Sequence, residues 1–285
     1  MKAATPKLTI ARQGQRWVSI RSVPSGLACN CRCPACGAAL IAKKGRRQQH
    51  HFAHAHGVEC VGGWETALHR FAKHVILSER QVWLPPVEVF KVGTVRPAQL
   101  LRATKAEAEV TRGNLRLDVL LSGPNVELVV EIRVSHAVEA RKRRRLTQLG
   151  LPAIEIDMGR IYQVLGANGQ ADDIVALRRA ILRELNARQW LFSPLQHRWE
   201  YRLRKAAVQR KVHISQQGTY WHYHVYACPR NLRAIRSGYR AGESYARVFQ
   251  DCLHCQRCRE ITYEKEWVGF REIPLRPASV WCASD

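Results

Sequence analysis

Ten cysteines lie in this chain in two groups, and the first group shows a spacing that is typical of zinc sites. Cys33 and Cys36 are separated by two residues, and Gly37 follows them with the backbone freedom that such a tight turn needs. Zinc requires two more ligands, and the segment HHFAHAHGVEC, which begins at residue 50, supplies several. We predict that His54 and Cys60 complete the site.

Other side chains could replace a ligand at this first site. His51 is the main substitute, and Cys29 and Cys31 could compete. Tight Cys-x-x-Cys spacing beside histidines favours zinc over disulfides in a reducing compartment. Four protein ligands leave no open position on the ion, so the pattern indicates a structural zinc rather than a catalytic one.

The second group of cysteines lies near the end of the chain, after a long stretch without any. Its members include a Cys-x-x-Cys-x-x-Cys run, which again favours zinc over free thiols. We predict a second structural zinc site with four thiolate ligands, Cys228, Cys252, Cys255 and Cys258. His224 or His254 could replace one of these thiolates.

Two carboxylates stand inside patterns that are otherwise typical of apolar strands. Asp118 lies in LRLDVLL (115–121), and Glu131 lies in VELVVEIRV (126–134). A charged residue in such a run is costly to bury unless it is paired or binds a metal. A short turn joins the strands, so the two carboxylates could reach neighbouring positions and form an oxygen site suited to Mg²⁺ or Mn²⁺. Alternatively, each carboxylate pairs with a nearby arginine, and the spacing favours neither interpretation.

A helix precedes these strands and carries polar residues that could join the site. Apolar residues at intervals of three and four predict an amphipathic helix over ETALHRFAKHVILSER. Glu65, His69 and Lys73 lie four residues apart and would therefore form one stripe along it.

The following segments predict a mixed sheet flanked by helices. A basic helix is expected over 136–150, and a buried strand over 152–158, so that both form a βαβ unit with strand 126–134. Further helices are expected over 171–188 and 194–211. Near the N-terminus, KLTIA and RWVSI predict a hairpin across a glycine-containing turn.

In their order and spacing, these motifs resemble the CoiA-like competence proteins. CPACGAALIAKKG, HFAH, a cysteine and E-x-x-x-H-x-x-x-K are similar to the N-terminal half of that family. LDVLL and VVEIRVS are similar to its Asp-Val strand and its Glu-x-Gln/Lys-x-Ser strand. The resemblance covers about residues 29–160. It implies a nuclease core of the PD-(D/E)xK superfamily with an attached zinc knuckle, linked to DNA uptake and recombination.

The resemblance also implies a catalytic set, in which Asp118 and Glu131 hold the divalent ion and Ser135 is the small polar residue after the motif. The complete set is Glu65, His69, Lys73, Asp118, Glu131 and Arg133. Arg133 departs from the superfamily, which usually has lysine there, and an arginine is not deprotonated. Arg133 could still stabilise the transition state electrostatically, or Lys73 could supply the missing ammonium.

The charge of the chain points to phosphate-bearing partners. Lys and Arg number 46 against 23 Asp and Glu, which gives a net charge of +23. Five successive basic residues are predicted to contact the DNA backbone, Arg141, Lys142, Arg143, Arg144 and Arg145. In the basic helix expected over 194–211, Trp199 and Tyr201 could stack on unpaired bases or pack in the core.

The composition is that of an ordinary folded protein, with 46% hydrophobic and 24% charged residues. No apolar stretch reaches 18 residues, and the N-terminus lacks the apolar region of a signal peptide. We therefore expect a cytoplasmic protein without a membrane span.

Together these observations predict an α/β (α+β) protein: a restriction-endonuclease-like mixed sheet with flanking helices and small zinc-binding modules at both ends. The expected segments are a zinc-binding β module (1–62), a nuclease-like core (63–170), a basic helical segment (171–211) and a zinc-ribbon-like module (212–285). The expected function is that of a Mg²⁺- or Mn²⁺-dependent DNA endo- or exonuclease, or a DNA-processing protein of uptake, recombination or defence. It would act on double- or single-stranded DNA, with other recombination or defence proteins as further partners. The alternative is a catalytically degenerate, zinc-containing nucleic-acid-binding module.

Overall fold

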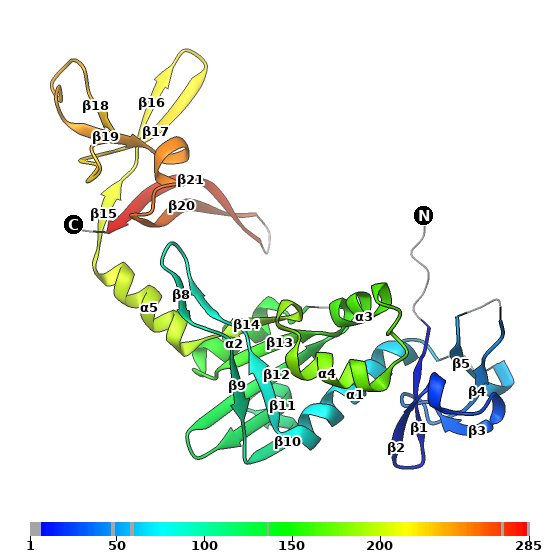
Figure 1. Ribbon diagram of the computed structural model, residues 1–285. Helices are drawn as coiled ribbons and strands as arrows, with labels where there is room; N and C mark the ends of the chain where they lie inside the picture. The colour runs from blue at the N-terminus through cyan, green and yellow to red at the C-terminus, as the bar shows by residue number, and fades with distance from the viewer. Residues whose placement is uncertain (1–6, 47–48, 58–59, 136, 269–270, 284–285) are drawn as a thin grey trace. The chain divides into compact units, whose positions relative to one another are not determined.

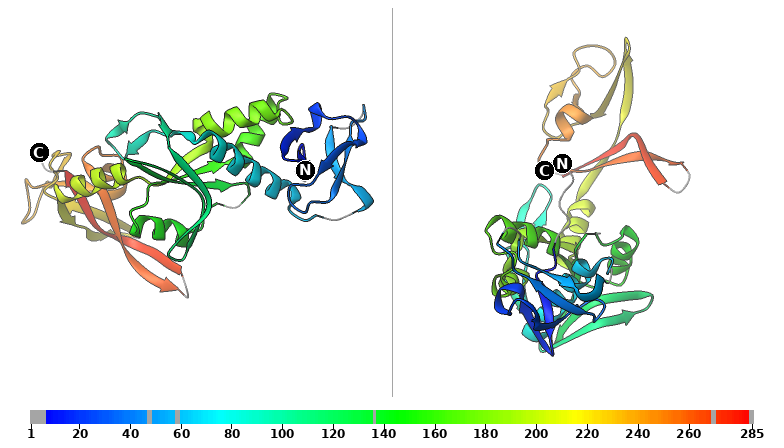
Figure 2. Two further views of the ribbon diagram at one scale, coloured as in Figure 1. Left: turned by 90° about the horizontal axis from the view of Figure 1, so that it is seen from below. Right: turned by 90° about the vertical axis from the view of Figure 1, so that its right-hand side faces the viewer.

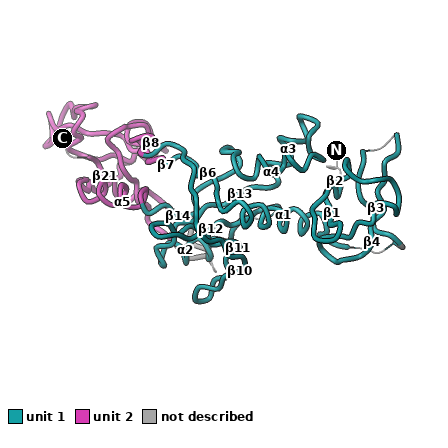
Figure 3. The backbone as a smooth tube through the Cα atoms, turned by 60° about the horizontal axis from the view of Figure 1, so that its bottom comes forward, with its two compact units in different colours: residues 1–87, 96–194 teal, residues 88–95, 195–285 magenta. Residues whose placement is uncertain are grey.

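The computed structural model describes residues 7–46, 49–57, 60–135, 137–268 and 271–283 (Figure 1). The chain separates into two units, which are coloured separately in Figure 3. The first comprises residues 1–87 and 96–194, and the second comprises 88–95 and 195–285. Helices and antiparallel sheets occur in both, so the protein is of the mixed α+β class.

The first unit begins with a five-stranded antiparallel sheet in the order β2-β1-β3-β4-β5. Its strands are β1 (Ile10–Gln13), β2 (Arg16–Ser19), β3 (Gly26–Arg32), β4 (Ala39–Lys43) and β5 (His51–His54). The expected hairpin forms as β1 and β2, and Gly14 in its two-residue turn has φ +57°, which favours glycine. The sheet carries the loops of the first cysteine group.

Helix α1 (Gly63–Glu79) follows the N-terminal sheet, as the apolar spacing predicts. Its buried stripe includes Leu68, Phe71, Ala72, Val75 and Ile76. The helix ends where Arg80 adopts the left-handed conformation and donates its backbone N–H to the Ile76 carbonyl at 2.9 Å. Strands β6 (Gln81–Leu84) and β9 (Gln99–Arg102) then form a small antiparallel pair.

A second five-stranded sheet lies at the centre of the first unit, in the order β10-β11-β12-β13-β14. Its strands are β10 (Lys105–Arg112), β11 (Leu115–Gly123), β12 (Val126–Arg133), β13 (Ala153–Asp157) and β14 (Arg188–Phe192). Neighbouring strands are antiparallel except β12 and β13, which are parallel. Helix α2 (Ala140–Gln148) connects this parallel pair, so the expected βαβ unit forms.

Helices cover both faces of the central sheet. On one face, Val130 and Ile154 share a core with α1, α3 (Met158–Ala167) and α4 (Ile174–Arg183). On the other face, Leu146 of α2 packs in a separate cluster that includes Val129. Because α4 contributes Leu177 and Ile181 to the first core, the expected basic segment 171–211 is divided between the two units.

The second unit contains α5 (Pro194–Lys205), two small sheets and the turn of a hairpin. One sheet has the order β15-β21-β20, and the other has the order β16-β17-β19-β18. Their strands are β15 (Ala207–Lys211), β16 (His213–Gln217), β17 (Tyr220–Tyr226), β18 (Arg233–Ala234), β19 (Ser244–Arg247), β20 (Cys258–Val268) and β21 (Arg271–Ala283). The hairpin pairs β7 (Val87–Val89) with β8 (Gly93–Arg96). Figure 2 shows β20 and β21, in orange and red, as one long hairpin.

The helix expected over 194–211 is shorter than its basic pattern suggested. It ends at Lys205, and residues 207–211 instead form β15, which pairs with β21. Strand pairing with a segment some 70 residues further along the chain thus overrides the local helical pattern. Within the described ranges, no helix has both the length and the apolar character needed to cross a bilayer.

Candidate metal centre and acidic site

The four residues predicted for the first zinc site lie together in the structure. The ligand atoms of Cys33, Cys36, His54 and Cys60 are all within 4.8 Å of one another. Cys33 and Cys36 lie in the turn between β3 and β4, His54 ends β5, and Cys60 immediately precedes α1. Gly37 has φ +76° in this turn and donates its N–H to the Cys33 carbonyl at 2.9 Å, which is why glycine is favoured there.

The donor set of this cluster fits zinc. Three thiols and one imidazole are a common ligand set of structural zinc sites, and His54 Nε2 lies 3.4 Å from Cys36 Sγ. A hydrogen bond from the Ala38 backbone holds the pKa of the Cys36 thiol below its usual value, whereas burial raises the pKa of Cys60 to about 11. At Gly63, a Cβ atom would lie 2.8 Å from Cys60 Sγ, so only glycine lets α1 begin this close to the cluster. The cluster could therefore hold a zinc ion.

The alternative ligands considered for this site have other partners. Cys29 donates its thiol to the Leu40 carbonyl at 3.3 Å, and Cys31 donates to the Cys29 carbonyl at 3.2 Å. Both cysteines are buried, and burial raises the pKa of Cys31 to about 12. His51 Nδ1 donates to the Gln49 carbonyl at 2.9 Å. None of these three residues belongs to the cluster.

Asp118 is surrounded by hydrogen-bond donors. Lys73 Nζ lies 2.8 Å from Asp118 Oδ1, and His69 Nε2 lies 3.2 Å from Asp118 Oδ2. The backbone N–H of Ile132 donates to the same Oδ2 at 2.9 Å. Burial alone would raise the pKa of Asp118, but the hydrogen bonds from these donors outweigh burial and hold that pKa well below its usual value. Two residues of the predicted helical stripe therefore meet Asp118.

A third acid, which the sequence analysis did not single out, joins this group. Lys73 also forms an ion pair with Glu109 on β10. On β10 and β11, Ala108 pairs with Val119 and Val110 pairs with Leu117, so Glu109 lies opposite Asp118. The φ of +56° at Glu109 marks a local distortion of β10. Alternating glutamates in KAEAEVTR are the one signal in the sequence that could have pointed to it.

Glu131 is more deeply buried than Asp118, with a side chain only 3% exposed. Its Oε2 atom accepts a hydrogen bond from Lys142 Nζ of α2 at 2.5 Å. Its Oε1 atom is buried and has no hydrogen-bond partner among the described residues. Burial, together with the nearby charge of Asp118, raises the pKa of Glu131 to about 7.

The two carboxylates are neighbours across the strands but are held from different sides. The register of β11 and β12 pairs Val119 with Val130, and Asp118 and Glu131 each lie one residue beyond this pair. Asp118 is bound by side chains of α1, whereas Glu131 is bound by a side chain of α2, on the opposite face of the sheet. Side chains two residues apart on a strand normally face the same side of the sheet. In β11 this rule fails around Asp118, because Leu117 packs in the cluster that contains Leu146 of α2, whereas Val119 packs in the core that contains α1. Both acids are ion-paired, Asp118 with Lys73 and Glu131 with Lys142.

Glu65 shares a hollow of about 410 Å³ with the donors of Asp118. The hollow is lined by Glu65, Thr66, His69, Arg70, Lys73, Glu109, Val134 and Ser135. Neither Asp118 nor Glu131 lines it. The structure therefore brings Glu65, His69, Lys73 and Ser135 to one surface, and it brings Asp118 into contact with two of them.

Arg133 is directed to a different pair of acids. It forms ion pairs with Glu155, at 3.5 Å, and with Asp157, which lies opposite it on β13. Glu155 is buried and also accepts hydrogen bonds from the Val138 backbone and the Gln189 side chain, each at 2.8 Å. Arg133 thus belongs to an internal network, and the ammonium beside Asp118 is that of Lys73.

The basic run on α2 divides into two roles. Lys142 points inward, since it donates to Glu131 and, at 2.7 Å, to the Arg116 carbonyl. Its four neighbours in the run are exposed, Arg141, Arg143, Arg144 and Arg145. Three of them, together with Arg116 and Lys142, line a basic hollow of about 680 Å³. Such a surface is suited to bind phosphate groups.

The C-terminal cysteines are not gathered like those of the first site. Cys228, Cys252 and Cys258 are buried and Cys255 is partly exposed, but they do not form a comparable ligand cluster among the described residues. His224, a possible substitute ligand, is within hydrogen-bonding distance of the Tyr226 hydroxyl, at 2.9 Å.

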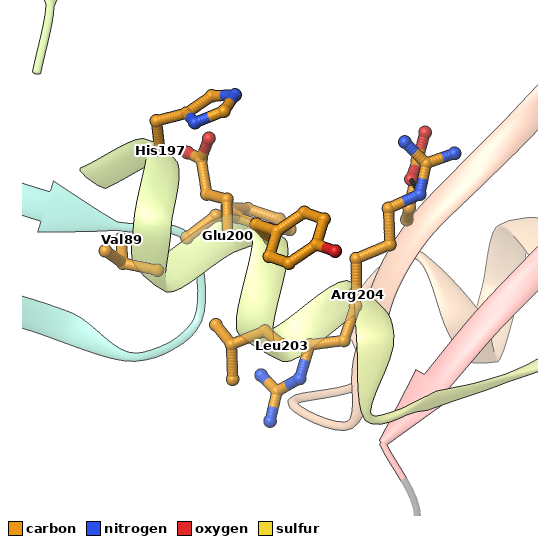
Figure 4. Close-up of a pocket in the computed structure, with 9 residues that line it drawn as sticks. Val89, His197, Glu200, Leu203 and Arg204 are labelled. Carbon is orange, nitrogen blue, oxygen red and sulfur yellow. Dashed lines mark ion pairs between the residues drawn. The ribbon is translucent and has the colours of Figure 1, made fainter. Parts of the chain in front are cut away.

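Helix α5 borders a hollow of about 390 Å³ within the second unit (Figure 4). Phe90 and Tyr201 both line it and are 67% and 62% exposed. Arg204 lines it as well and forms an ion pair with Glu260 at 3.2 Å. The hollow therefore combines two exposed aromatic rings with guanidinium groups, a combination that is typical of surfaces that bind single-stranded nucleic acid.

If this hollow binds single-stranded nucleic acid, Tyr201→Ala should weaken binding of a single-stranded oligonucleotide about tenfold, because one stacked base contributes about 1–3 kcal/mol. Duplex binding should change little, since paired bases are not available to stack. Fluorescence anisotropy at one fixed salt concentration measures both affinities. Tyr239→Ala is the matched control, because Tyr239 is fully exposed and does not line the hollow. Equal losses for both nucleic acids would contradict a stacking role.

Comparison with known proteins adds no relative. No protein-family model matches the chain, and no curated protein or solved structure gives a significant match.

Proposed function

We propose that the protein is a Mg²⁺- or Mn²⁺-dependent deoxyribonuclease of the PD-(D/E)xK type, with zinc bound near its N-terminus. The observation that carries this proposal is the state of Glu131. Two features of Glu131 are unfavourable for its charged form: its buried Oε1 has no hydrogen-bond partner among the described residues, and burial together with the charge of Asp118 raises its pKa. A divalent cation between the two acids would remove both costs.

The arrangement of the first unit supports the proposed core. After α1 and the short strands β6 to β9, three antiparallel strands (β10, β11 and β12) are followed by the crossover helix α2 and the parallel strand β13. This is a mixed sheet with flanking helices, which the resemblance to CoiA-like proteins implies. It puts the aspartate of LDVLL and the glutamate of VVEIRVS on adjacent strands.

The residues have distinct proposed roles. Asp118 and Glu131 would hold the ion, which when bound polarises a phosphate oxygen and lowers the pKa of water. Lys73 supplies an ammonium whose Nζ lies 2.8 Å from Asp118 Oδ1, in the place left by Arg133. Because the Lys73 side chain is only 9% exposed, its charge acts with little solvent screening on a nearby phosphate. His69 orients the Asp118 carboxylate.

The exposed arginines of α2 would position the DNA. Arg141, Arg144 and Arg145 line the basic hollow beside Lys142, which itself contacts Glu131. Contacts to phosphate oxygens fix the register of a nucleic acid without reading its sequence. The net charge of +23 supports strong, salt-dependent binding to such a backbone.

One observation favours a second candidate, a degenerate nuclease core that binds nucleic acid without cutting it. Lys73, His69 and Lys142 already bind the two acids, and they do so from opposite faces of the sheet. A divalent ion would have to displace Lys142 from Glu131 and compete with Lys73 for Asp118. In the second candidate these ion pairs are permanent features of the fold.

The deciding experiment is a cleavage assay with linear, circular and single-stranded DNA, with Mg²⁺ or Mn²⁺. We expect Asp118→Asn and Glu131→Gln each to reduce cleavage at least about 100-fold, because each removes one of the charges that hold the ion. Glu127→Gln is the matched control, since Glu127 lies exposed on the same strand as Glu131 and pairs with Arg112.

Two other outcomes have clear meanings. Cleavage that persists in both variants would exclude the proposed site. Absence of cleavage under every condition, with tight salt-sensitive binding retained, would select the non-cutting nucleic-acid-binding protein.

A further inference from the structure

The core of the second unit is built largely from cysteines. Its buried cluster consists of Val212, Val225, Cys228, Ala246, Val248, Cys252, Cys258, Val280 and Cys282. Four of these nine residues are cysteines, and none of them forms a disulfide. A unit of this size with so few large apolar side chains has little hydrophobic stabilisation of its own. Small domains of this kind usually depend on a disulfide or a metal.

Four different elements bring the buried thiols together. Cys228 follows β17, Cys252 ends the π-helical turn Val248–Cys252, and Cys258 begins β20. Cys282 lies near the end of β21, and the strand register places it directly opposite Cys258. All four, together with Cys255, line one small cavity.

Cys255 differs from the other four in its surroundings. It is partly exposed, whereas the exposed fractions of the other four are 7% or less. The Cys255 backbone links the two neighbouring cysteines: its N–H donates to the Cys252 carbonyl, and its carbonyl accepts from the Cys258 N–H, each at 3.1 Å. The Cys-x-x-Cys-x-x-Cys run therefore forms two successive tight turns that turn its first and last thiols into the core.

A lysine from the β7–β8 hairpin stabilises these turns. Lys91 Nζ donates to the Cys255 carbonyl at 2.5 Å and to the Leu253 carbonyl at 3.3 Å. Lys91 lies in the hairpin turn with φ +59°, which is uncommon for a residue other than glycine. A positive charge beside the cavity offsets the negative charge that four thiolates would carry around a divalent ion.

We propose that Cys228, Cys252, Cys258 and Cys282 bind a second zinc ion, and that Cys255 is not a ligand. The set differs from the one expected from sequence spacing, because Cys282 replaces Cys255. Since the thiols are less closely gathered than those of the first site, the ion would draw them together by rotation of their side chains. The site is structural, because four protein ligands leave no open position. It is independent of the proposed nuclease activity.

The zinc content of the purified full-length chain tests the proposal. We expect two zinc ions per chain in the wild type, and one in Cys282→Ser and in Cys258→Ser. Cys255→Ser is the matched control and should keep two, while Cys33→Ser, at the first site, should keep one. A wild-type protein that contains only one zinc ion would overturn the proposal. So would two zinc ions in Cys282→Ser together with one in Cys255→Ser, because Cys255 would then be the ligand.

A second measurement uses the wild type, in case the Cys282→Ser chain does not fold. Alkylation followed by peptide mass spectrometry should modify Cys255 in the zinc-loaded protein, while Cys282 and the other ligands react only after chelation. Modification of Cys282 as fast as Cys255 in the zinc-loaded protein would contradict the proposal. A disulfide between Cys258 and Cys282 would also contradict it, and would appear as an intact mass lower by two hydrogens than that of the fully reduced chain.

Discussion

Cys33→Ser is expected to remove the N-terminal zinc ion and to unfold the structure around it. Apparent binding free energies of structural zinc in small modules are about 10–16 kcal/mol, and part of this free energy maintains the fold. Cys33 is only 3% exposed and belongs to the core that joins the N-terminal sheet to α1. Loss of several kcal/mol should lower Tm by about 10 °C or more in a protein of this size. Metal analysis and thermal unfolding followed by circular dichroism measure the two effects.

The matched control for this prediction is Cys31→Ala. Cys31 is also buried, at 2% exposure, and lies two residues away, but it is not part of the ligand cluster. We expect Cys31→Ala to retain its zinc and to lose only the contribution of one small buried side chain. If Cys33→Ser kept its full zinc content, the assignment of the ligands would be wrong.

Lys142→Met is expected to destabilise the first unit by about 3 kcal/mol above pH 7, in zinc-containing buffer without Mg²⁺ or Mn²⁺. Lys142 is the residue whose Nζ binds Glu131 Oε2, and methionine keeps much of its length without its charge. The substitution leaves a buried carboxylate without compensation, which is one of the most costly changes in a protein interior. Urea unfolding measures the free energy of unfolding for both proteins.

The effect of Lys142→Met should depend on pH. The ordinary pKa of a glutamate is 4.5, and that of Glu131 in the folded protein is raised to about 7. Between these values the folded state binds more protons than the unfolded state, so the contribution of Glu131 to stability falls as pH rises. Lys142 lowers the pKa of Glu131. Without Lys142 that pKa is higher still, so the folded protein continues to lose stability as the pH rises further. The difference between variant and wild type should therefore be large at pH 8.5 and small at pH 5.5.

A double substitution and a metal titration complete this test. Glu131→Gln in the Lys142→Met background should restore much of the stability, because the uncompensated charge at residue 131 is then removed. If Asp118 and Glu131 bind a divalent ion, Mn²⁺ should raise the Tm of Lys142→Met more than that of the wild type, since the ion no longer competes with an ammonium. Equal destabilisation at both pH values would contradict the role assigned to Glu131.

Asp118 should contribute to stability with the opposite sign. Its pKa is lowered in the folded state by His69 and Lys73, so its contribution is present above its ordinary pKa of 3.8. That contribution is lost as pH falls through the acid range. The two acids on neighbouring strands thus have opposite pH dependences, because burial and the charge of Asp118 raise the pKa of Glu131, whereas hydrogen bonds from His69 and Lys73 lower that of Asp118.

The sequence alone determined those features that depend on local spacing. The Cys-x-x-Cys turn with its glycine, the amphipathic helix α1 and the strands that carry Asp118 and Glu131 follow from short-range patterns. The residues that gather at the first metal cluster are also those predicted, because the cluster is assembled from three segments within 28 residues of one another. Backbone geometry and hydrophobic periodicity are sufficient at that range.

Only the tertiary structure decided which partners the buried groups have. Lys73 meets Asp118, Lys142 meets Glu131 and Arg133 is held by Asp157, and nothing in their spacing distinguishes these pairings from others. Likewise, Cys282 lies opposite Cys258 because of the register of a long hairpin. Such contacts arise when distant segments pair and pack, and a single sequence contains no local signal of strand register or of the face that a helix covers.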